Sequence, residues 1–172
     1  MIQPNMYFRR KAGDVQSAWP QWNGSAPFAG KTGNRRSPAQ RAGLRYEAKA
    51  LKHLEQVLPL FLSHLPFCFL AEYGTERCIP DGVAISSRDR SLLTLIEIKH
   101  RHSADAWFQL KYLYWPVVRA AFPRHRIQLL EVCGSYDPAV NVPDRQTRVD
   151  DLLGYVERGG EQFAVYPWSG KF

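Results

Sequence analysis

Hydrophobic and polar residues follow a helical period over the first well-patterned part of the chain. From residue 37 to residue 58, apolar positions recur every three or four residues, as on the buried face of an amphipathic helix. Ser37-Pro38-Ala39-Gln40 has the form of a capping box with proline at the first helical position, so the helix should begin there and end before Pro59. Glu47 falls on the apolar stripe, where a carboxylate is costly unless something compensates it. The stripe consists of Leu44, Leu51, Leu54 and Leu58.

Three β-prone segments come next, over residues 67–73, 78–86 and 92–99. Short polar connections separate them, at residues 74–77 and 87–91, and this pattern is typical of an antiparallel meander. We therefore expect three consecutive strands, each paired with the next.

The second half of the chain predicts two more helices and two more strands. Ser103 is a suitable N-cap for a helix that runs towards residue 122, and Pro116 is expected to kink this helix. Further along we expect a strand over residues 127–133, a short helix over 149–158 ended by Gly159 and Gly160, and a last edge strand over 163–168. The expected order is α, β, β, β, α, β, α, β, which predicts an α/β domain with a small central mixed sheet flanked by helices.

The first 36 residues show neither a helical nor a strand period and are rich in glycine, proline, serine, asparagine and tryptophan. We expect a partly disordered arm there, followed by a single domain over residues 37–172. The formal charge is +7, and residues 1–45 carry eight lysines and arginines against one acid, whereas the rest of the chain is balanced. A local basic segment favours a polyanionic partner, nucleic acid before an acidic membrane, with solubility as the alternative. The residues expected to contact nucleic acid are Lys31, Arg35, Arg36, Arg41 and Arg45.

Composition excludes several other classes of protein. With 45% hydrophobic and 13% aromatic residues, the chain should fold rather than stay disordered throughout. Its longest apolar run, from residue 57, is interrupted well before the roughly 18 residues that a membrane span needs. No secretory signal is visible at the start, and three widely spaced cysteines favour reduced core thiols over disulfides or a zinc site. We therefore expect a cytoplasmic protein.

Three side chains of the predicted strands are expected to meet at one point. Glu97 and Lys99 lie two residues apart at the end of a strand and so share one of its faces. Asp81 lies in a Pro-Asp-Gly bend of the preceding segment, which a meander places beside Glu97. Two carboxylates a few Å apart repel each other unless a hard divalent cation lies between them, and Mg²⁺ is the usual occupant, with Mn²⁺ as its substitute. The expected further ligands are the backbone carbonyl of Ile98 and, as an outer or second-metal carboxylate, Glu47.

This arrangement suits the hydrolysis of a phosphodiester bond. A cation held by Asp81 and Glu97 would lower the pKa of a water molecule and neutralise charge on the phosphate. Lys99 would donate to that water or to a non-bridging phosphate oxygen. The sequence thus leads to the hypothesis of a metal-dependent nuclease.

The same residues resemble a known family. Pro80-Asp81, then Glu97-Ile98-Lys99 after a hairpin, with Glu47 on a preceding helix, is similar to the PD-(D/E)xK nuclease superfamily. The resemblance covers about residues 38–133 and implies a restriction-endonuclease-like α-β-β-β-α-β core and a Mg²⁺-dependent deoxyribonuclease. Members include restriction enzymes, phage exonucleases, junction resolvases and recombination-repair nucleases, which implies repair, recombination, phage DNA processing or defence in a bacterial or phage-infected cell.

The resemblance also implies two further candidates on the helix after the motif. Repair-type members place a glutamine there, followed four residues later by a tyrosine. In this chain Gln109 has Tyr112 three residues after it, Leu113 at the family's position and Tyr114 five residues after it. Gln109, Tyr112 and, in the loop that follows Lys99, His100 are therefore second-tier candidates.

Each motif has a plainer explanation, and two rival functions stay open. Pro-Asp-Gly is a common turn, a Glu-x-Lys strand end is usually a solvated face, and His100 and His102 could be polar loop residues. The first rival is a non-catalytic DNA-binding or assembly module of the same fold, because a fold does not fix an activity. The second is an unrelated basic nucleic-acid-binding protein. Duplex, branched and single-stranded DNA, and a homo-oligomer or a partner protein, all remain open.

Overall fold

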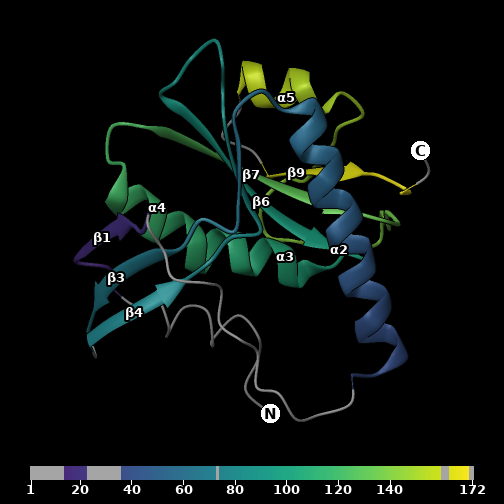
Figure 1. The fold of residues 1–172 in the computed structure, drawn as a ribbon, viewed down its shortest axis with the longest axis horizontal. Coiled ribbons are helices and arrows are strands. Elements are labelled where there is room, and N and C mark those ends of the chain that lie inside the picture. The colour runs from purple at the N-terminus through teal and green to yellow at the C-terminus, as the bar shows by residue number, and fades with distance from the viewer. Residues whose placement is uncertain (1–13, 23–35, 73, 160–162, 171–172) are drawn as a thin grey trace.

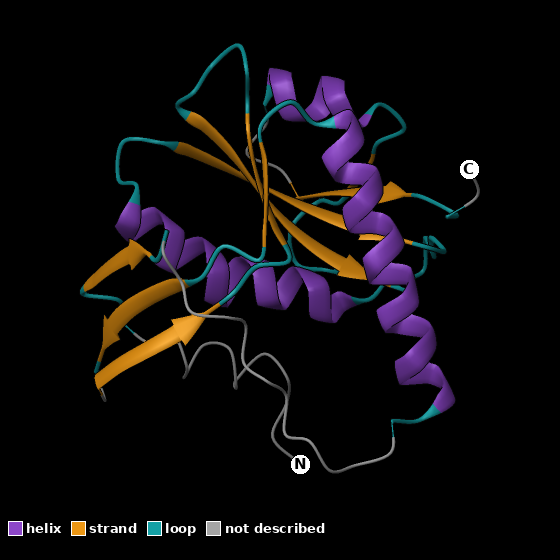
Figure 2. Ribbon diagram, viewed as in Figure 1, coloured by secondary structure: helices purple, strands orange, loops and turns teal. Residues whose placement is uncertain are grey.

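The computed structural model describes residues 14–22, 36–72, 74–159 and 163–170, which form two sheets and several helices (Figure 1; Figure 2). The helices are α2 (Pro38–Val57), α3 (Ala104–Gln109), the π-helical segment η1 (Leu110–Tyr114), α4 (Trp115–Ala121) and α5 (Leu152–Arg158). The strands are β1 (Ser17–Pro20), β2 (Phe61–Ser63), β3 (Phe67–Ala71), β4 (Gly74–Cys78), β5 (Gly82–Ile85), β6 (Leu92–Lys99), β7 (Arg126–Cys133), β8 (Thr147–Arg148) and β9 (Phe163–Pro167).

The larger sheet is mixed and has its strands in the order β2-β5-β6-β7-β9-β8. The pairs β2–β5 and β5–β6 are antiparallel, whereas β6–β7, β7–β9 and β8–β9 are parallel. A parallel neighbour needs a crossover connection, and α3, η1 and α4 supply it between β6 and β7. The start of β5 and the ends of β6 and β7 therefore lie at the same edge of the sheet.

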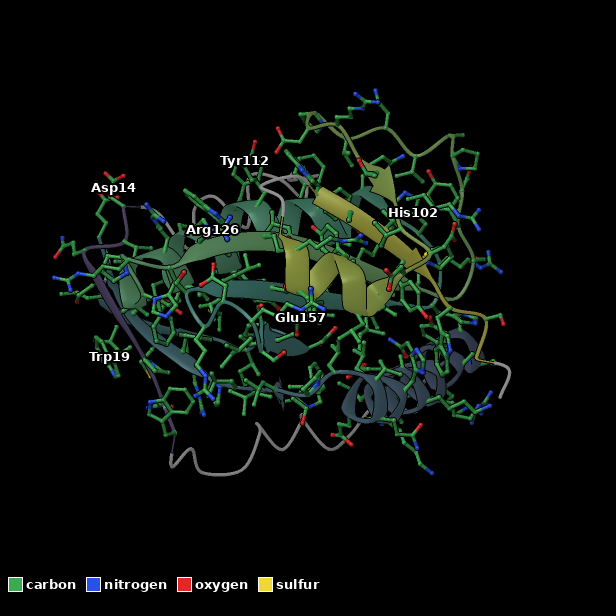
Figure 3. The ribbon with its side chains drawn as sticks, turned by 90° about the horizontal axis from the view of Figure 1, so that it is seen from above. Asp14, Trp19, His102, Tyr112, Arg126 and Glu157 are labelled. Atoms are coloured by element: carbon green, nitrogen blue, oxygen red, sulfur yellow. The ribbon has the colours of Figure 1, made fainter. Side chains whose placement is uncertain are left out.

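Helices cover both faces of this sheet, which confirms the predicted α/β class (Figure 3). Leu93 and Leu95 of β6 pack against the crossover helices. Ile96 and Ile98, which point the other way, pack against α2 and α5. Since side chains of a strand alternate between its faces, Glu97 and Lys99 face the crossover.

The first helix forms where the sequence predicts it. Ser37 accepts a hydrogen bond from the backbone N–H of Gln40, and the Gln40 side chain accepts one from the backbone N–H of Ser37, so the capping box is complete. The predicted stripe is wrong at its first turn, where Leu44 is 41% exposed. The helix reaches past the sheet at this end, so its buried face begins one turn later. That face consists of Tyr46, Ala50 and Leu54.

A separate three-stranded antiparallel sheet, in the order β1-β3-β4, replaces part of the predicted meander. Residues 74–77 are not a connection but most of β4, whose polar side chains suit an exposed edge strand. The strand that pairs with β5 on this side is β2 and not the predicted first strand of the meander. The sequence pattern did not separate β2 from the apolar run that begins at residue 57. β1 pairs with β3, so Ser17–Pro20 of the predicted arm belongs to the fold.

The crossover helix contains an irregular turn in front of Pro116. Proline has no N–H to bond the carbonyl four residues earlier, which disfavours a regular α-helix at this point. In η1 the N–H of Trp115 instead donates to the carbonyl of Leu110, five residues before it. Pro116 therefore produces a π-turn in an otherwise continuous helix, as well as the expected break in its regular bonding. Ser103 precedes the helix as predicted, but its side chain makes no capping hydrogen bond among the described residues.

The C-terminal part also differs in detail from the prediction. α5 is capped by Asp151, whose side chain accepts from the N–H of Gly154 at 2.8 Å, and it ends at Gly159. Gly159 has a φ of +74°, a conformation that favours glycine. β9 is not an edge strand, because the two-residue strand β8 pairs with it on the outer side. A strand of two exposed residues leaves no hydrophobic pattern to read.

The three cysteines, Cys68, Cys78 and Cys133, are buried as reduced thiols, as predicted. Within the described residues, the structure has no helix that is long and apolar enough to cross a membrane.

Candidate active site

The Pro-Asp-Gly bend connects β4 to β5 and is tied to the end of β6. Asp81 Oδ2 accepts a hydrogen bond of 2.7 Å from the backbone N–H of Ile98. The N–H and C=O of a strand residue point to the same side, so the carbonyl of Ile98 is also directed towards Asp81. A Cβ on Gly82 would lie 2.4 Å from the ring of Phe61, so close packing of β2 on β5 requires this glycine. The bend is therefore fixed on both sides and does not act as a plain solvent-exposed turn.

Glu97 and Lys99 form a half-buried pair next to this bend. Lys99 Nζ donates to Glu97 Oε1 at 2.6 Å and to Gln109 Oε1 at 3.3 Å. The Glu97 residue is only 3% exposed. Its second oxygen, Oε2, is buried and receives no hydrogen bond from the described residues. A buried carboxylate oxygen without a donor is costly, because nothing replaces the hydrogen bonds that it would make to water.

Glu47 and His64 complete the site from the other side of the sheet edge. His64 Nε2 lies 3.4 Å from Glu47 Oε1, and the backbone N–H of His64 donates to the carbonyl of Asp81 at 3.1 Å. One ligand atom each of Glu47, His64 and Asp81 lies within 4.8 Å of the others. Glu47 is thus not buried in the core as the stripe predicted, because its side chain is 31% exposed at the mouth of this cluster.

His64 is a candidate ligand that the sequence did not reveal. It has a φ of 51°, in the left-handed region that residues other than glycine rarely occupy. Strain of this kind persists only where the surrounding structure imposes it, and it is concentrated at functional sites. The imidazole follows β2 directly, and no spacing in the sequence relates it to Glu47 or Asp81.

Burial and neighbouring negative charge raise the pKa values of two carboxyl groups in the cluster. Burial, together with the charge of Glu47, raises the pKa of Asp81 to about 6. Burial and the charge of Asp81 raise the pKa of Glu97 to about 8. Burial lowers the pKa of Lys99, but the neighbouring Glu97 outweighs this effect and the pKa is raised overall. Two carboxyl groups with raised pKa values thus lie beside a charged lysine.

The π-turn places Tyr114, and not Tyr112, in the site. Residues five apart in an α-helix differ by about 1.4 turns, but hydrogen bonding from i to i+5 brings them onto one face. Gln109 Nε2 accordingly donates to the hydroxyl of Tyr114, which in turn donates to the carbonyl of Ile79 at 3.1 Å. Tyr112 was expected in the site, but it packs against the rings of Trp107 and Phe108.

The remaining candidates are only partly brought to the site. His100 is exposed, and its ring lies 5.6 Å from that of Tyr46 and not against the carboxylates of the site. Arg36, Arg41 and Arg45 are exposed at the N-terminal end of α2, and Arg36 shares a surface hollow with Glu47. Lys31 and Arg35 lie outside the described residues.

A second polar cluster lies beside the site, within the sheet. Glu131 of β7 is the register partner of Glu97 and is fully buried. It binds His102 Nδ1 at 2.7 Å and accepts from the backbone N–H of Ser103 at 3.1 Å, while His102 Nε2 lies 2.9 Å from Gln146. His102 is therefore buried and is not the polar loop residue that its position suggested.

The residues present fit a hard divalent cation. Asp81 and Glu97 offer carboxylate oxygens, one of which receives no hydrogen bond from the described residues, and Ile98 offers a carbonyl directed to the same side. Carboxylate and carbonyl oxygens are the ligands that Mg²⁺ prefers, and the nearby imidazole of His64 makes Mn²⁺ a suitable substitute. Glu47 and His64 each offer a ligand atom within 4.8 Å of one on Asp81, so they would lie beside such an ion.

We expect the metal-free protein to lose stability as the pH rises. A carboxyl group with a raised pKa in the folded state stabilises the fold fully below its unfolded value of about 4, and this contribution is lost through about pH 8. For Asp81 and Glu97, with pKa values of about 6 and about 8, the loss should extend over that range. A cation needs the ionised carboxylates, so Mn²⁺ should raise the unfolding temperature more at about pH 8 than at about pH 6. At a hundredfold excess over Kd, the added free energy of unfolding is about 2.7 kcal/mol.

Thermal unfolding with and without Mn²⁺ measures this effect. Asp81→Asn should remove most of the Mn²⁺-dependent shift, whereas Glu55→Gln, at an exposed position of α2, should leave it intact. A shift that is equal in both variants would place the cation elsewhere.

Comparisons with known proteins found no relative: no family model, no curated protein and no solved structure matches this chain.

Proposed function

We propose that this protein is a Mg²⁺-dependent deoxyribonuclease of the PD-(D/E)xK type. The observation that carries the proposal is the hydrogen bond from Ile98 N–H to Asp81, which joins the Pro-Asp-Gly bend to the strand end that bears Glu97 and Lys99. Two carboxylates with raised pKa values and a lysine thereby share one site, with Glu47 at its outer side. This is the chemistry that phosphodiester hydrolysis needs.

The order of the elements supports the same proposal. Leaving aside the small sheet, α2, β2, β5, β6, the crossover helix and β7 follow one another as α-β-β-β-α-β. The strands β2, β5, β6 and β7 are neighbours in that order, and β7 is parallel to β6. In this interpretation β3 and β4 are an insertion between the first and second core strands.

The contact between Gln109 and Tyr114 supports a place among the repair-type members. Their glutamine and tyrosine are four residues apart, but a π-turn permits the same pairing at a spacing of five. Gln109 also binds Lys99, so the pair positions the lysine.

Each residue of the site has a task in this proposal. Bound to Asp81 and Glu97, Mg²⁺ would neutralise charge on the phosphate and favour deprotonation of the attacking water. Glu97 accepts from Lys99 with Oε1, and its Oε2 would hold the cation. Lys99, charged and fixed by two acceptors, donates to the phosphate oxygen on which negative charge develops. Preorganisation of this kind avoids reorientation in the transition state.

Exposed arginines near the site suit a polyanionic substrate. Arg36, Arg41 and Arg45 extend from the start of α2, and Arg36 borders the same hollow as Glu47. DNA whose phosphates contact them would pass close to the carboxylates. Such contacts are independent of sequence and weaken with salt.

We expect the purified protein to cut end-labelled DNA in the presence of Mg²⁺ or Mn²⁺ and not in EDTA. Duplex, branched and single-stranded substrates tested side by side would identify the preferred shape and separate internal from terminal cleavage. Glu97→Gln should abolish cutting, and the matched variant Glu55→Gln, at an exposed glutamate, should retain it.

The same experiment separates the rival functions. DNA that is bound but not cut in any divalent cation would favour a non-catalytic module of the same fold. Cutting that Glu97→Gln retains would indicate a contaminating nuclease.

A further inference from the structure

A basic groove lies on the outer side of the crossover helix, between this helix and the start of β7. It is a hollow of about 370 Å³, and no acidic side chain is among the described residues that line it. Arg126, at the start of β7, lies at the opposite end of the sheet from His102, which follows the end of β6 (Figure 3). The residues that define the groove are Lys111, Trp115, Arg119, Arg124 and Arg126.

The charge of the groove comes from an unusual stretch of sequence. Residues 106–130 contain four lysines and arginines and no aspartate or glutamate. Positive and negative side chains beyond residue 45 are therefore balanced in number but unevenly distributed, with a basic surface here and an acidic excess elsewhere. The structure folds this stretch so that all four cations line one hollow.

Two of the four cations are held by exposed ion pairs, which are weak. Lys111 Nζ lies 3.2 Å from Asp144, and Arg126 lies 2.8 Å from Asp89, in exposed ion pairs of the kind that contribute at most about 1 kcal/mol. Arg119 donates to the carbonyl of His125 at 2.9 Å, a bond that joins α4 to the loop before β7 and fixes one wall of the groove. Phosphate oxygens could therefore replace the acids at little cost in free energy.

The length of the groove indicates a polymer and not a small anion. Lys111 and Arg119 are eight residues apart on one helix, a rise of roughly 12 Å, which is the axial rise of three to four nucleotides of a DNA strand. One phosphate group cannot reach both ends, whereas consecutive phosphates can. Trp115 lies between them, with Lys111 5.6 Å from its ring, and offers an aromatic surface to a sugar or an unpaired base.

The groove is distinct from the candidate active site. Tyr114 reaches towards Ile79, on the β5 side of β6, whereas Lys111 reaches towards Asp144, beyond β7. Since β5 and β7 flank β6 on opposite sides, the two surfaces lie on opposite flanks of the crossover helix.

We propose that this groove binds the phosphate backbone of the DNA substrate away from the cleaved bond. The proposal rests on the proposed function for the identity of its ligand. Residues 111–126 bind DNA without sequence specificity in this proposal, as the arginines of α2 do, so that the DNA contacts both flanks of the crossover helix.

The test compares three variants by fluorescence anisotropy with labelled DNA in EDTA, where cleavage cannot occur. The groove variant Arg119→Gln/Arg124→Gln/Arg126→Gln should bind at least about tenfold more weakly and lower the slope of log K against log salt by about two to three. A matched variant, Lys49→Gln/Lys52→Gln/Arg158→Gln, removes the same charge from exposed positions and should bind like the parent. Arg124→Glu alone, at an exposed side chain, guards against a loss of folding and should still weaken binding.

Equal binding by the groove variant and the matched variant would overturn the proposal and leave the groove to another partner. Hydrolysis of bis(p-nitrophenyl) phosphate, which is too small to span the groove, separates this result from the catalytic proposal. The groove variants should hydrolyse it like the parent. Loss of DNA binding with no hydrolysis of this ester by the parent would support the groove and contradict the nuclease.

Discussion

Replacing Lys99 by methionine is expected to slow DNA cleavage by about 100- to 1000-fold at saturating divalent cation, a loss of about 2.7–4 kcal/mol of transition-state stabilisation. Methionine keeps an unbranched side chain but removes the ammonium that Glu97 and Gln109 hold at 2.6 and 3.3 Å. That ammonium is oriented before the substrate binds, so its loss affects the transition state more than the ground state. Single-turnover cleavage with excess protein measures the chemical step without product release.

The matched control is Lys52→Met, at an exposed position of α2. It removes the same charge far from Glu97 and should cut at the parental rate. Lys99→Met protein that also cuts at the parental rate, while Lys52→Met behaves normally, would remove the lysine from the mechanism. DNA binding in EDTA should be nearly equal in both variants, because neither residue belongs to the basic groove.

Replacing Glu131 by alanine is expected to lower the free energy of unfolding by about 3–5 kcal/mol. The carboxylate is fully buried, binds His102 at 2.7 Å and accepts from Ser103 N–H at 3.1 Å. Its removal leaves a buried imidazole and a backbone N–H without their acceptor. Chemical denaturation monitored by tryptophan fluorescence gives the change.

Two further variants test the assignment of Glu131. Glu131→Gln keeps an acceptor oxygen for Ser103 and should cost less than the alanine variant. Glu55→Ala, at an exposed position, should change stability by less than about 0.5 kcal/mol. A Glu131→Ala protein as stable as Glu55→Ala would show that the buried pair contributes no net stability.

The parts of the fold that the sequence predicted are those governed by local rules. The capping box at Ser37 set the start of α2, and alternation along β6 put Glu97 and Lys99 on one face, where the structure has them. The bend at Asp81 was recognised from Pro-Asp-Gly. Only the structure showed what fixes it, namely the N–H of Ile98 and the ring packed on Gly82.

The parts that escaped prediction depend on long-range contacts or on irregular backbone. β1 and β4 form the edges of a small sheet, and their sequences, SAWP and GTERC, show no alternation of apolar and polar residues. β8 has only two residues. Tyr114 reaches Gln109 through a π-turn that a regular helical period cannot express. His64 enters the site through a left-handed backbone that its sequence neighbours do not indicate.

Two features of the sequence indicate functional or buried residues that the motif analysis missed. Glu131 interrupts the apolar run of residues 129–133, which marks a carboxylate that must have a buried partner. Residues 106–130 contain no acid, which marks a basic surface that the balanced total charge concealed. Both features concern the distribution of charge along a segment and not its sum.

Binding of Mn²⁺ to the metal-free protein tests the central claim most directly, because it does not depend on the identity of the DNA. Unbound Mn²⁺ is counted by electron paramagnetic resonance during a titration at about pH 8, which lies above the pKa of Asp81 and close to that of Glu97. The parent and Glu55→Gln should bind the ion, and Asp81→Asn and Glu97→Gln should lose this binding. Equal binding by all four proteins, or none by the parent, would contradict a metal site at Asp81 and Glu97.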